Sequence, residues 1–492
     1  MESIYQSLCK HWQKISRFKY LSALGEWDQA TMMPTGASQA RAEAMAELQV
    51  HVHQLKIQPQ LEDWFALAKQ EELSHEETLN LQGMYRQWFQ ATVLPESLVR
   101  EKTIVTQQCE HAWRTQRKEN DWAGFAKNLK QVIALVRTEA QIKADAYSCQ
   151  PYDAMIDAYE PGMNSAKLAS IFAELKNWLP DMIQQVVEKQ KSEPRMNPLG
   201  KYPIQNQEML CQSVLSLLPF QLECGRTDTS IHAFSCGIPE DARLTTNFIE
   251  EDFKPGLSSL IHEAGHGCYQ QNLPKQWRGL PIGEAISMGI HESQSLFFEM
   301  QLAKSEPFLR QLLPLMNQHL QTQFGIDELI NINTRVQPGH IRIYADEMTY
   351  PAHIMLRFEI EKSLLDNSLE VDDIPEAWDQ KMQSYLGIST KGDFQNGCMQ
   401  DIHWTFGEFG YFPSYSLGAF YAAQFYAAIV KQTPDLSASL STGNFNPVFE
   451  WLKTNIWQKG SLMMPEAIIE KATGEPFNLK YFKLHLESRY LN

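Results

Sequence analysis

The sequence predicts a mainly α-helical fold class, with one large helical domain and a small β-sheet. Most of the chain shows helical spacing of apolar residues and is rich in strong helix formers. One short segment instead shows the alternation and turn residues of strands. No Ser/Gly-rich linker, low-complexity tract or fixed-period repeat interrupts the 492 residues. We therefore expect one domain over 1–492, although length alone would allow about three.

Five segments in the N-terminal part carry amphipathic helical patterns. The first follows Pro34-Thr35-Gly36 and is rich in Ala, Glu and Leu. The polar run 193–200, with its prolines and glycine, predicts a loop. We therefore divide the domain into an N-terminal helical part (1–190), expected to cover a cleft, and a second part (200–492). The predicted helices are 36–56, 62–93, 97–118, 121–146 and 165–190.

Residues 229–248 depart from the helical pattern. Turns are indicated at Cys236-Gly237 and Pro239-Glu240, between short stretches of strand-forming residues. Two or three short strands are expected, and the edge of such a sheet can hydrogen-bond an extended peptide. Asp241 and Arg243 fall on one strand candidate, where a structural ion pair is the simpler interpretation.

The net charge of −16 argues against a nucleic-acid partner, because phosphate binding needs clustered Lys and Arg. The 8 cysteines form no CxxC pair, and in a chain of this size they indicate reduced thiols in a cytosolic protein. The N-terminus has no basic end followed by an apolar stretch, and no run of about 18 apolar residues occurs. We therefore expect a cytoplasmic protein without a membrane segment.

The run HEAGH at residues 262–266 carries the chemical signal. On a helix, His262 and His266 lie on one face, so both imidazoles can bind one metal ion. Glu263 then lies beside the open coordination position, where its carboxylate can take a proton from metal-bound water. This spacing is typical of zinc-dependent peptidases.

The surrounding residues favour a helix over this run. Apolar residues recur at helical intervals from Leu257 to Cys268, after a plausible helix start at Pro255-Gly256. Gly265 and Gly267 each destabilise such a helix by about 1 kcal/mol relative to alanine. Close approach of a substrate or of a neighbouring helix would explain these two glycines.

A tetrahedral zinc with one open position needs a third protein ligand. Glu292 is the leading candidate, because a carboxylate in an apolar helical segment is expensive to bury unless it is paired or metal-bound. His291 would point elsewhere and is expected to support a ligand. Glu284 and Glu299 remain alternatives, and Glu299 could share a helix face with Glu292.

Arg342 is a candidate anchor for a carboxylate, because its planar guanidinium can donate two parallel hydrogen bonds. The alternative is a surface helix pair between Arg342 and Asp346.

A second polar segment contains Asp401 and His403, which could orient ligands or a substrate group. Tyr411 or Tyr415 could donate a hydrogen bond to the oxyanion of a tetrahedral intermediate. The alternative for this segment is an aromatic core with a satisfied histidine.

Six ordered motifs resemble those of the carboxypeptidase Taq family of HExxH metallocarboxypeptidases. The family motifs are HPF, DxRxT, HExxH, HES followed by Gln or Gly, IRxxAD and GxxQDxHW. They correspond here to His232–Phe234, Asp241–Thr245, His262–His266, His291–Gln294, Ile341–Asp346 and Gly397–Trp404. Further similarity covers essentially the whole chain, at Trp27–Gln29, Met32–Pro34, Tyr159–Met163 and His485–Tyr490.

The resemblance implies a largely helical fold with a deep active-site groove, in which 200–492 is the catalytic part. It implies Zn2+ (or Co2+) bound by His262, His266 and Glu292, with Glu263 as the catalytic base. It also implies a homodimer and peptide substrates with a free C-terminus, trimmed one residue at a time with broad side-chain tolerance. The residues expected to contact the substrate or the oxyanion are Arg342, His232, Asp401, His403, Tyr411 and Tyr415.

Two positions depart from the family pattern. Ala233 replaces the proline of the first motif, which predicts a less rigid turn. Tyr344 occupies a position that is often acidic in relatives, which could alter subsite preference. Two other functions stay open: an endo-acting or dipeptide-releasing metallopeptidase, and a helical binding protein with a vestigial metal site.

Overall fold

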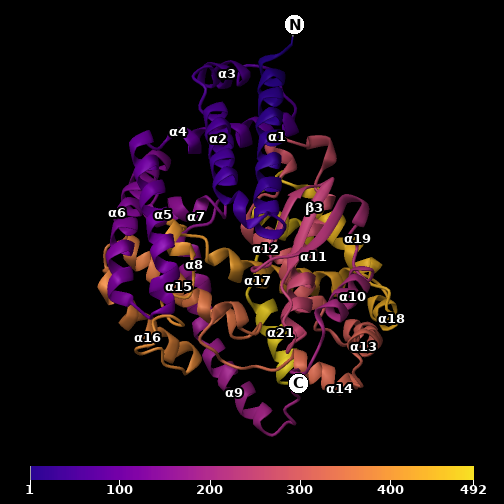
Figure 1. Cartoon of the computed structure of the whole chain (residues 1–492). Helices are drawn as coiled ribbons and strands as arrows, with labels where there is room; N and C mark the ends of the chain where they lie inside the picture. The colour runs from indigo at the N-terminus through magenta and orange to yellow at the C-terminus, as the bar shows by residue number, and fades with distance from the viewer. Residues whose placement is uncertain (1) are drawn as a thin grey trace.

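The structure, a computed structural model, describes residues 2–492 and consists of α-helices around one small sheet (Figure 1). The predicted fold class, mainly α with a small sheet beside the helix of the HEAGH run, is confirmed. The N-terminal helices α1 to α3 form the upper part of the molecule in Figure 1. With α4 they share a small hydrophobic cluster, which Leu280 and Ile282 complete. These elements are α1 (Ile4–Thr31), α2 (Ser38–Lys56), α3 (Gln60–Ala68) and α4 (His75–Thr92).

The segment predicted as one helix over 62–93 is two helices, so that prediction is wrong. The chain leaves α3 after Ala68 and starts α4 at His75. Ser74 and Glu77 form a capping box there: the Ser74 hydroxyl accepts from the Glu77 amide at 3.2 Å, and the Glu77 carboxylate accepts from the Ser74 amide at 2.9 Å. These bonds satisfy amides at the start of α4, so a new helix begins inside a continuous helical pattern.

The prediction of one helix over 165–190 is wrong for a related reason. α8 ends at Lys176, and Pro180 lies in the first turn of α9. Proline fits the start of a helix but removes a hydrogen bond inside one. The helices predicted over 36–56, 97–118 and 121–146 and the loop at 193–200 are confirmed. The elements of this region are α5 (Glu96–Lys118), α6 (Trp122–Tyr147), α7 (Pro151–Asp157), α8 (Ser165–Lys176), α9 (Leu179–Lys191) and α10 (Ile204–Leu215).

The predicted strands form one sheet with the order β1-β3-β2. β1 pairs with β3 in parallel, with Gly225 opposite Ala242, and β2 pairs with β3 in antiparallel, with Ser235 opposite Leu244. β1 begins before the predicted segment, and the turn predicted at Cys236-Gly237 is wrong, because both residues lie in β2 and pair with β3. Ala242 and Leu244 are buried, so β3 joins the sheet to the core beneath it. The strands are β1 (Gly225–Thr229), β2 (Ser235–Ile238) and β3 (Asp241–Thr246).

The remaining helices build the centre and base of the molecule. α12 continues into a π-helical turn at Phe297–Leu302, and π-bulges of this kind are frequent at functional sites. The helices are α11 (Lys254–Asn272), α12 (Met288–Leu296), α13 (Glu306–Leu320), α14 (Ile326–Asn333), α15 (Tyr350–Leu365), α16 (Ile374–Leu386), α17 (Pro413–Gln432), α18 (Leu436–Ser441), α19 (Asn446–Asn455), α20 (Pro465–Thr473) and α21 (Lys480–Tyr490).

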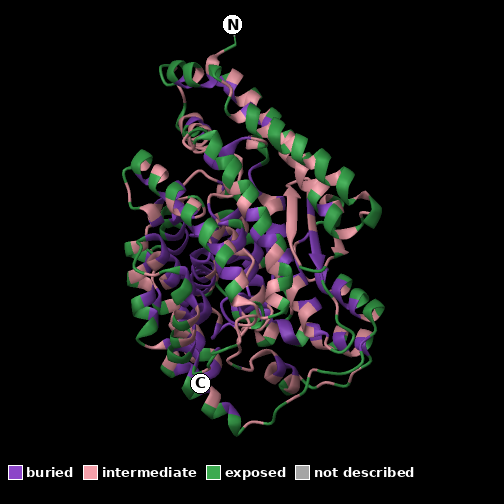
Figure 2. Cartoon of the chain, turned by 60° about the vertical axis from the view of Figure 1, so that its left-hand side comes forward, coloured by how far each residue is buried: buried purple, intermediate pink, exposed green. Residues whose placement is uncertain are grey.

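Buried residues concentrate in the centre of the molecule, while the outer helices keep exposed outer faces (Figure 2). One large hydrophobic cluster contains residues of α5 to α9 together with residues from the sheet to α21. The loop at 193–200 therefore does not separate two hydrophobic cores.

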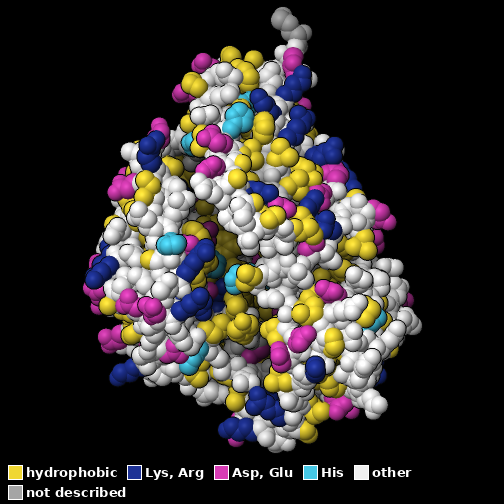
Figure 3. All heavy atoms as spheres, in the orientation of Figure 1, with side chains coloured by type: hydrophobic (Ala, Val, Ile, Leu, Met, Phe, Trp, Pro, Cys, Tyr) yellow, Lys and Arg dark blue, Asp and Glu magenta, His cyan; other side chains and the backbone are white. Residues whose placement is uncertain are grey.

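The face shown in Figure 3 is hollowed along its middle, between the side of α4 to α6 and the side of β3 and α11. Histidine and hydrophobic side chains are visible inside this groove. That residues 1–190 cover the groove stays a prediction. Within residues 2–492, no helix combines the length and the hydrophobicity that crossing a membrane requires.

Candidate metal centre

The HEAGH run lies on α11, which crosses α12 at very close range. A side chain at Gly265 would place its Cβ 2.5 Å from the carbonyl oxygen of Gln294 on α12. A Cβ at Gly267 would lie 2.7 Å from the Phe220 ring and 2.8 Å from Leu244. Both glycines are therefore explained by packing: Gly265 against a neighbouring helix, and Gly267 against Phe220 and the sheet residue Leu244. The close crossing brings the backbone of α12 next to the face of α11 that carries the histidines.

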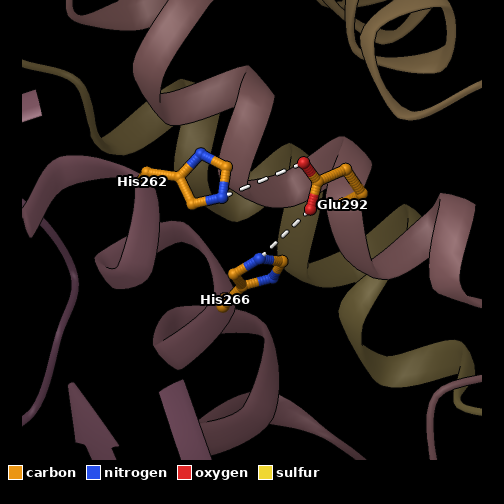
Figure 4. Close-up of side chains that lie close together, drawn as sticks. All are labelled: His262, His266 and Glu292. Carbon is orange, nitrogen blue, oxygen red and sulfur yellow. Dashed lines mark ion pairs between the residues drawn. The ribbon is translucent and has the colours of Figure 1, made fainter. Parts of the chain in front are cut away.

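His262, His266 and Glu292 converge at this crossing (Figure 4). His262 Nε2 lies 3.9 Å from Glu292 Oε1, and His266 Nε2 lies 3.3 Å from Glu292 Oε2. One ligand atom from each residue lies within 4.8 Å of the other two. Ligands about 2.1 Å from a tetrahedral zinc stand about 3.4 Å apart, so this donor set fits such an ion.

The other ring nitrogen of each histidine has its own partner. His262 Nδ1 lies 2.8 Å from Glu299 Oε2, and His266 Nδ1 lies 2.6 Å from His291 Nδ1. An Nδ1–H that donates to such a partner leaves the Nε2 lone pair free for a metal. Glu299 thus lies on the far side of His262, and Glu284 accepts a hydrogen bond from Gln87 at 3.3 Å. Of the three carboxylates considered, Glu292 is the one within reach of both imidazoles.

Burial lowers the pKa of His262, but Glu292 and Glu299 raise it, to about 10, so a metal ion that binds here must replace a proton of this imidazole. Burial raises the pKa of Glu292. Together, His262 and His266 outweigh burial and lower this pKa to about 2. Burial lowers the pKa of His291 to about 3, and the neighbouring His266 acts in the same direction. A neutral His291 can accept the Nδ1 proton of His266, which is the arrangement that metal ligation by Nε2 requires.

Glu263 is only 7% exposed, yet among residues 2–492 no side chain forms a hydrogen bond or ion pair with its carboxylate. Its carboxylate oxygens are not among the fully buried polar atoms that lack a partner, so they keep contact with solvent, as a group that acts on a water molecule requires.

Arg342 lies in a short 3-10 turn (Arg342–Tyr344) and is buried, so the alternative of a surface helix pair with Asp346 is wrong. Its partner is Asp401, whose Oδ1 accepts from Arg342 Nη2 at 2.9 Å. Arg357 Nε donates to the other oxygen of Asp401 at 2.7 Å. Asp346 instead accepts from backbone amides, including that of Thr349 at 3.0 Å.

A group of tyrosines lies near both the Arg342 cluster and Glu292 of the metal-ligand set. The Tyr350 hydroxyl accepts from Arg342 Nη1 at 3.3 Å, and the Tyr415 hydroxyl lies 3.4 Å from His403 Nε2. After burial, the nearby charge of Glu292 contributes to the raised pKa values of Tyr350, Tyr411 and Tyr415. These hydroxyls therefore stay protonated and are available as hydrogen-bond donors.

His232 lies apart from this constellation. It is exposed in the β1–β2 connection, and none of the hydrogen bonds or ion pairs of the described residues uses its ring. Its contact with a substrate stays a prediction.

Three nearby polar residues received no role in the sequence analysis: Arg357, Tyr350 and Glu160. Arg357 and Tyr350 belong to α15, which is buried over most of its length and so gives no amphipathic pattern from which to separate them. The only available signal for Tyr350 was its place just after the Arg342 motif.

A mainly helical fold in which an HExxH helix meets a glutamate of a second helix defines a metallopeptidase of the HExxH class. The chain belongs to the carboxypeptidase Taq (M32) metallopeptidase family, whose sequence model matches residues 7–490. The predicted enzyme class, a metallocarboxypeptidase, is thereby confirmed.

Individual relatives agree over the full length. Thermostable carboxypeptidase 1 of Thermus thermophilus is 34% identical over 99% of this chain and 98% of its own. Carboxypeptidase 1 of Bacillus subtilis is 32% identical over 98% of this chain and 96% of its own. The solved structure of Trypanosoma cruzi metallocarboxypeptidase 1 is similar with a TM-score of 0.97 at 39% identity, covering 99% of both chains.

Proposed function

We propose that this protein is a zinc-dependent carboxypeptidase that releases single C-terminal amino acids from peptides. The family supports carboxypeptidase activity. The observation that carries the finer proposal is the buried, positively charged Arg342 cluster, which contacts Tyr350 and Tyr415, two tyrosines near enough to Glu292 for its charge to raise their pKa values.

Zn2+ held by His262, His266 and Glu292 would supply an activated water and a polarising charge for the scissile carbonyl. Co2+ is an alternative metal for the same donor set. Glu263 is proposed to accept a proton from the attacking water and to deliver it to the leaving amine. Its proximity to His262 and its solvent-accessible carboxylate, which no side chain of the described residues pairs with, support this role.

The Arg342 cluster is proposed to hold the terminal carboxylate of the substrate. Two guanidinium groups, Arg342 and Arg357, face one carboxylate, Asp401. Burial lowers the pKa values of His403, to about 4, and of His353, so both histidines are neutral at pH 7. The cluster therefore carries one positive charge in excess, and a buried excess charge favours an anionic guest.

The hydroxyls of Tyr411 and Tyr415 are proposed donors to the oxyanion, with His403 orienting Tyr415. Burial raises the pKa of Tyr415 to about 12, so its proton is present across the working pH range. Asp401 is proposed to orient Arg342, and His232 to contact the substrate at the edge of the sheet. Broad side-chain tolerance is proposed from the family resemblance.

A cytoplasmic location and a homodimer complete the proposal. All eight cysteines are unpaired, which agrees with a reducing compartment. The dimer rests on the family resemblance, and light scattering of the purified protein tests it.

The decisive experiment is mass analysis of peptides incubated with the zinc-loaded protein. A ladder shortened one residue at a time from a free C-terminus, and no cleavage of the same peptide with an amidated C-terminus, is the expected result. Internal cleavage or release of dipeptides would favour the endo-acting or dipeptide-releasing alternative. Absence of hydrolysis and of bound zinc after dialysis would favour a vestigial site.

A further inference from the structure

Glu160 is a buried carboxylate that no step of the proposed reaction uses. It lies in the turn after α7 and is 1% exposed. Its Oε1 accepts a short hydrogen bond from the backbone amide of Gly289, in the first turn of α12. The hydroxyl of Ser414, in the first turn of α17, is buried without a hydrogen-bond partner among the described residues and lies near enough to Glu160 to lower the pKa of its carboxyl.

The preceding residue contacts the same two helices. The Tyr159 carbonyl accepts from the Met288 amide at 2.9 Å. The Tyr159 ring packs edge-on against Tyr411, just before α17, with ring centres 4.9 Å apart. Two adjacent residues of one turn therefore bind the start of α12 and the start of α17 together.

A carboxylate suits this position. The first amides of a helix have no partner within the helix, and the helix dipole places partial positive charge there. Glu160 meets both needs at the start of α12, and at the start of α17 it lies near the Ser414 hydroxyl. Burial raises its pKa to about 7, and the Gly289 amide and the hydroxyls of Ser414 and Ser287 lower it in part. A Cβ at Gly289 would lie 2.7 Å from Glu160 Oε1, so the contact leaves no room for a side chain.

The position of α12 against α17 decides where Glu292 lies. Glu292 follows Gly289 by one turn on α12. Its own side chain packs on Gly418 of α17, where a Cβ would come within 2.7 Å of Glu292 Cγ. With contact this tight, a small slide or rotation of α12 along α17 moves the Glu292 carboxylate away from the two imidazoles.

We propose that Glu160 is a positioning residue of the metal centre: by joining the first turns of α12 and α17, it holds Glu292 within reach of His262 and His266. This inference rests on the proposed function, in which Glu292 is a metal ligand. The competing interpretation is that Glu160 only stabilises the fold, which would change the unfolding temperature and leave metal affinity unaltered.

Zinc affinity of the full-length protein separates the two interpretations. The dissociation constant is measured by competition with a chromophoric chelator, at a temperature where circular dichroism shows each variant folded. Loss of a residue that orients a metal ligand without touching the metal typically weakens metal binding by about 10–100-fold. We expect such a loss for Glu160→Ala and a smaller one for Glu160→Gln, whose amide oxygen can still accept from Gly289.

Glu361→Gln is the matched control. Glu361 is also fully buried, and burial also raises its pKa to about 7, but its partners are Tyr152, Trp404 and Gly410 rather than α12. The same chemical change there should lower stability and leave zinc affinity within about twofold of the wild type. At saturating zinc, the Glu160 variants should lose kcat with little change in KM, because the Arg342 cluster lies on other elements.

Wild-type zinc affinity in both Glu160 variants would overturn the inference, whatever happens to their unfolding temperatures. If these variants do not fold, the Glu160→Asp variant replaces them in the test. Aspartate keeps the negative charge, but its side chain is shorter by one methylene, so the carboxylate lies farther from Gly289. Unchanged affinity in Glu160→Asp overturns the inference, and weakened affinity supports it. The measurement on the wild-type protein tests the proposed function separately. A wild-type protein that binds no zinc would reject the proposed function, whatever the Glu160 variants do.

Discussion

Glu263 and Glu292 are both largely enclosed glutamates that lie near His262, yet their contacts differ. Glu292 faces both histidines within 3.9 Å, whereas Glu263 has no partner among the described residues. A carboxylate that two imidazoles contact is suited to be a metal ligand. A carboxylate without a hydrogen-bond partner is available to exchange a proton with water. This contrast between adjacent acids underlies the first residue-scale prediction.

Glu263→Gln should retain zinc and lose turnover. The amide has nearly the same size but cannot take the proton from the water, and general-base catalysis contributes about 10²–10⁴-fold. The measurement is kcat on a peptide with a free C-terminus, together with zinc content by atomic absorption. Turnover close to that of the wild type would reject the assignment of Glu263 as the base.

Arg342→Met should weaken productive binding of peptides with a free C-terminus. A hydrogen bond to a charged group contributes about 1.5–3 kcal/mol, so kcat/KM should fall by about 10–100-fold. Arg357 still neutralises Asp401 in this variant, which limits the structural effect. Zinc content should remain that of the wild type. An unchanged kcat/KM would mean that the terminal carboxylate binds elsewhere.

At the scale of elements, the site is made by helices that cross closely at glycines. Gly265 lets α11 meet the backbone of α12, and Gly418 lets α17 meet the side chain of Glu292. The two histidines come from α11 and the glutamate from α12, so the ligand geometry depends on these crossings as much as on the ligands.

Gly265→Ala should therefore separate α11 from α12. The added Cβ would lie 2.5 Å from the Gln294 carbonyl oxygen, and overpacking of this kind destabilises by about 1–3 kcal/mol. We expect a lower unfolding temperature and weaker zinc binding. Gly36→Ala is the control, because a Cβ there meets nothing within 4 Å. Equal behaviour of the two variants would contradict the role of the crossing.

Glu361 joins α7, α15 and the loop before α17, and it should make stability depend on pH. Burial raises its folded-state pKa from 4.5 to about 7, although bonds from Gly410, Trp404 and Tyr152 lower it in part. Between these values the folded state binds more protons than the unfolded state, so stability falls as pH rises across this window. The full change is on the order of 3 kcal/mol.

Glu361→Gln removes this titration. The free energy of unfolding of the variant relative to the wild type should therefore increase from pH 5 to pH 8, and urea titrations at both pH values measure it. Glu160 titrates in both proteins and cancels in the difference. Parallel pH curves for the two proteins would show that Glu361 does not titrate in this range.

At the scale of the whole molecule, the metal would join α11 to α12 at the edge of the large core. A ligand that binds only the folded state stabilises it by RT ln(1 + [L]/Kd), about 4 kcal/mol at a thousandfold excess over Kd. Removal of the metal with a chelator should lower the unfolding temperature and abolish hydrolysis, and added zinc should restore both. Calorimetry of the stripped and reloaded protein tests this, and identical transitions would argue against a metal held by the folded state.

Local signals were enough for the fold class and for part of the site. The spacing of His262 and His266 places both rings on one helix face wherever that helix packs, because four residues make about one turn. Helical periodicity was enough for α2, α5 and α6. It missed the breaks before His75 and Leu179, because a capping box or an early proline restarts a helix without changing the apolar pattern.

By itself, the sequence determined the mainly helical class, the HExxH helix and the short strands before it, since each depends on residues within a few turns of one another. Only the tertiary structure decided which carboxylate reaches both imidazoles, that Arg342 pairs with Asp401 instead of Asp346, and that Glu160 meets two helix starts. These contacts join residues 25 or more positions apart. Their distances are set by how closely helices pack at Gly265, Gly289 and Gly418, and no local pattern encodes that closeness.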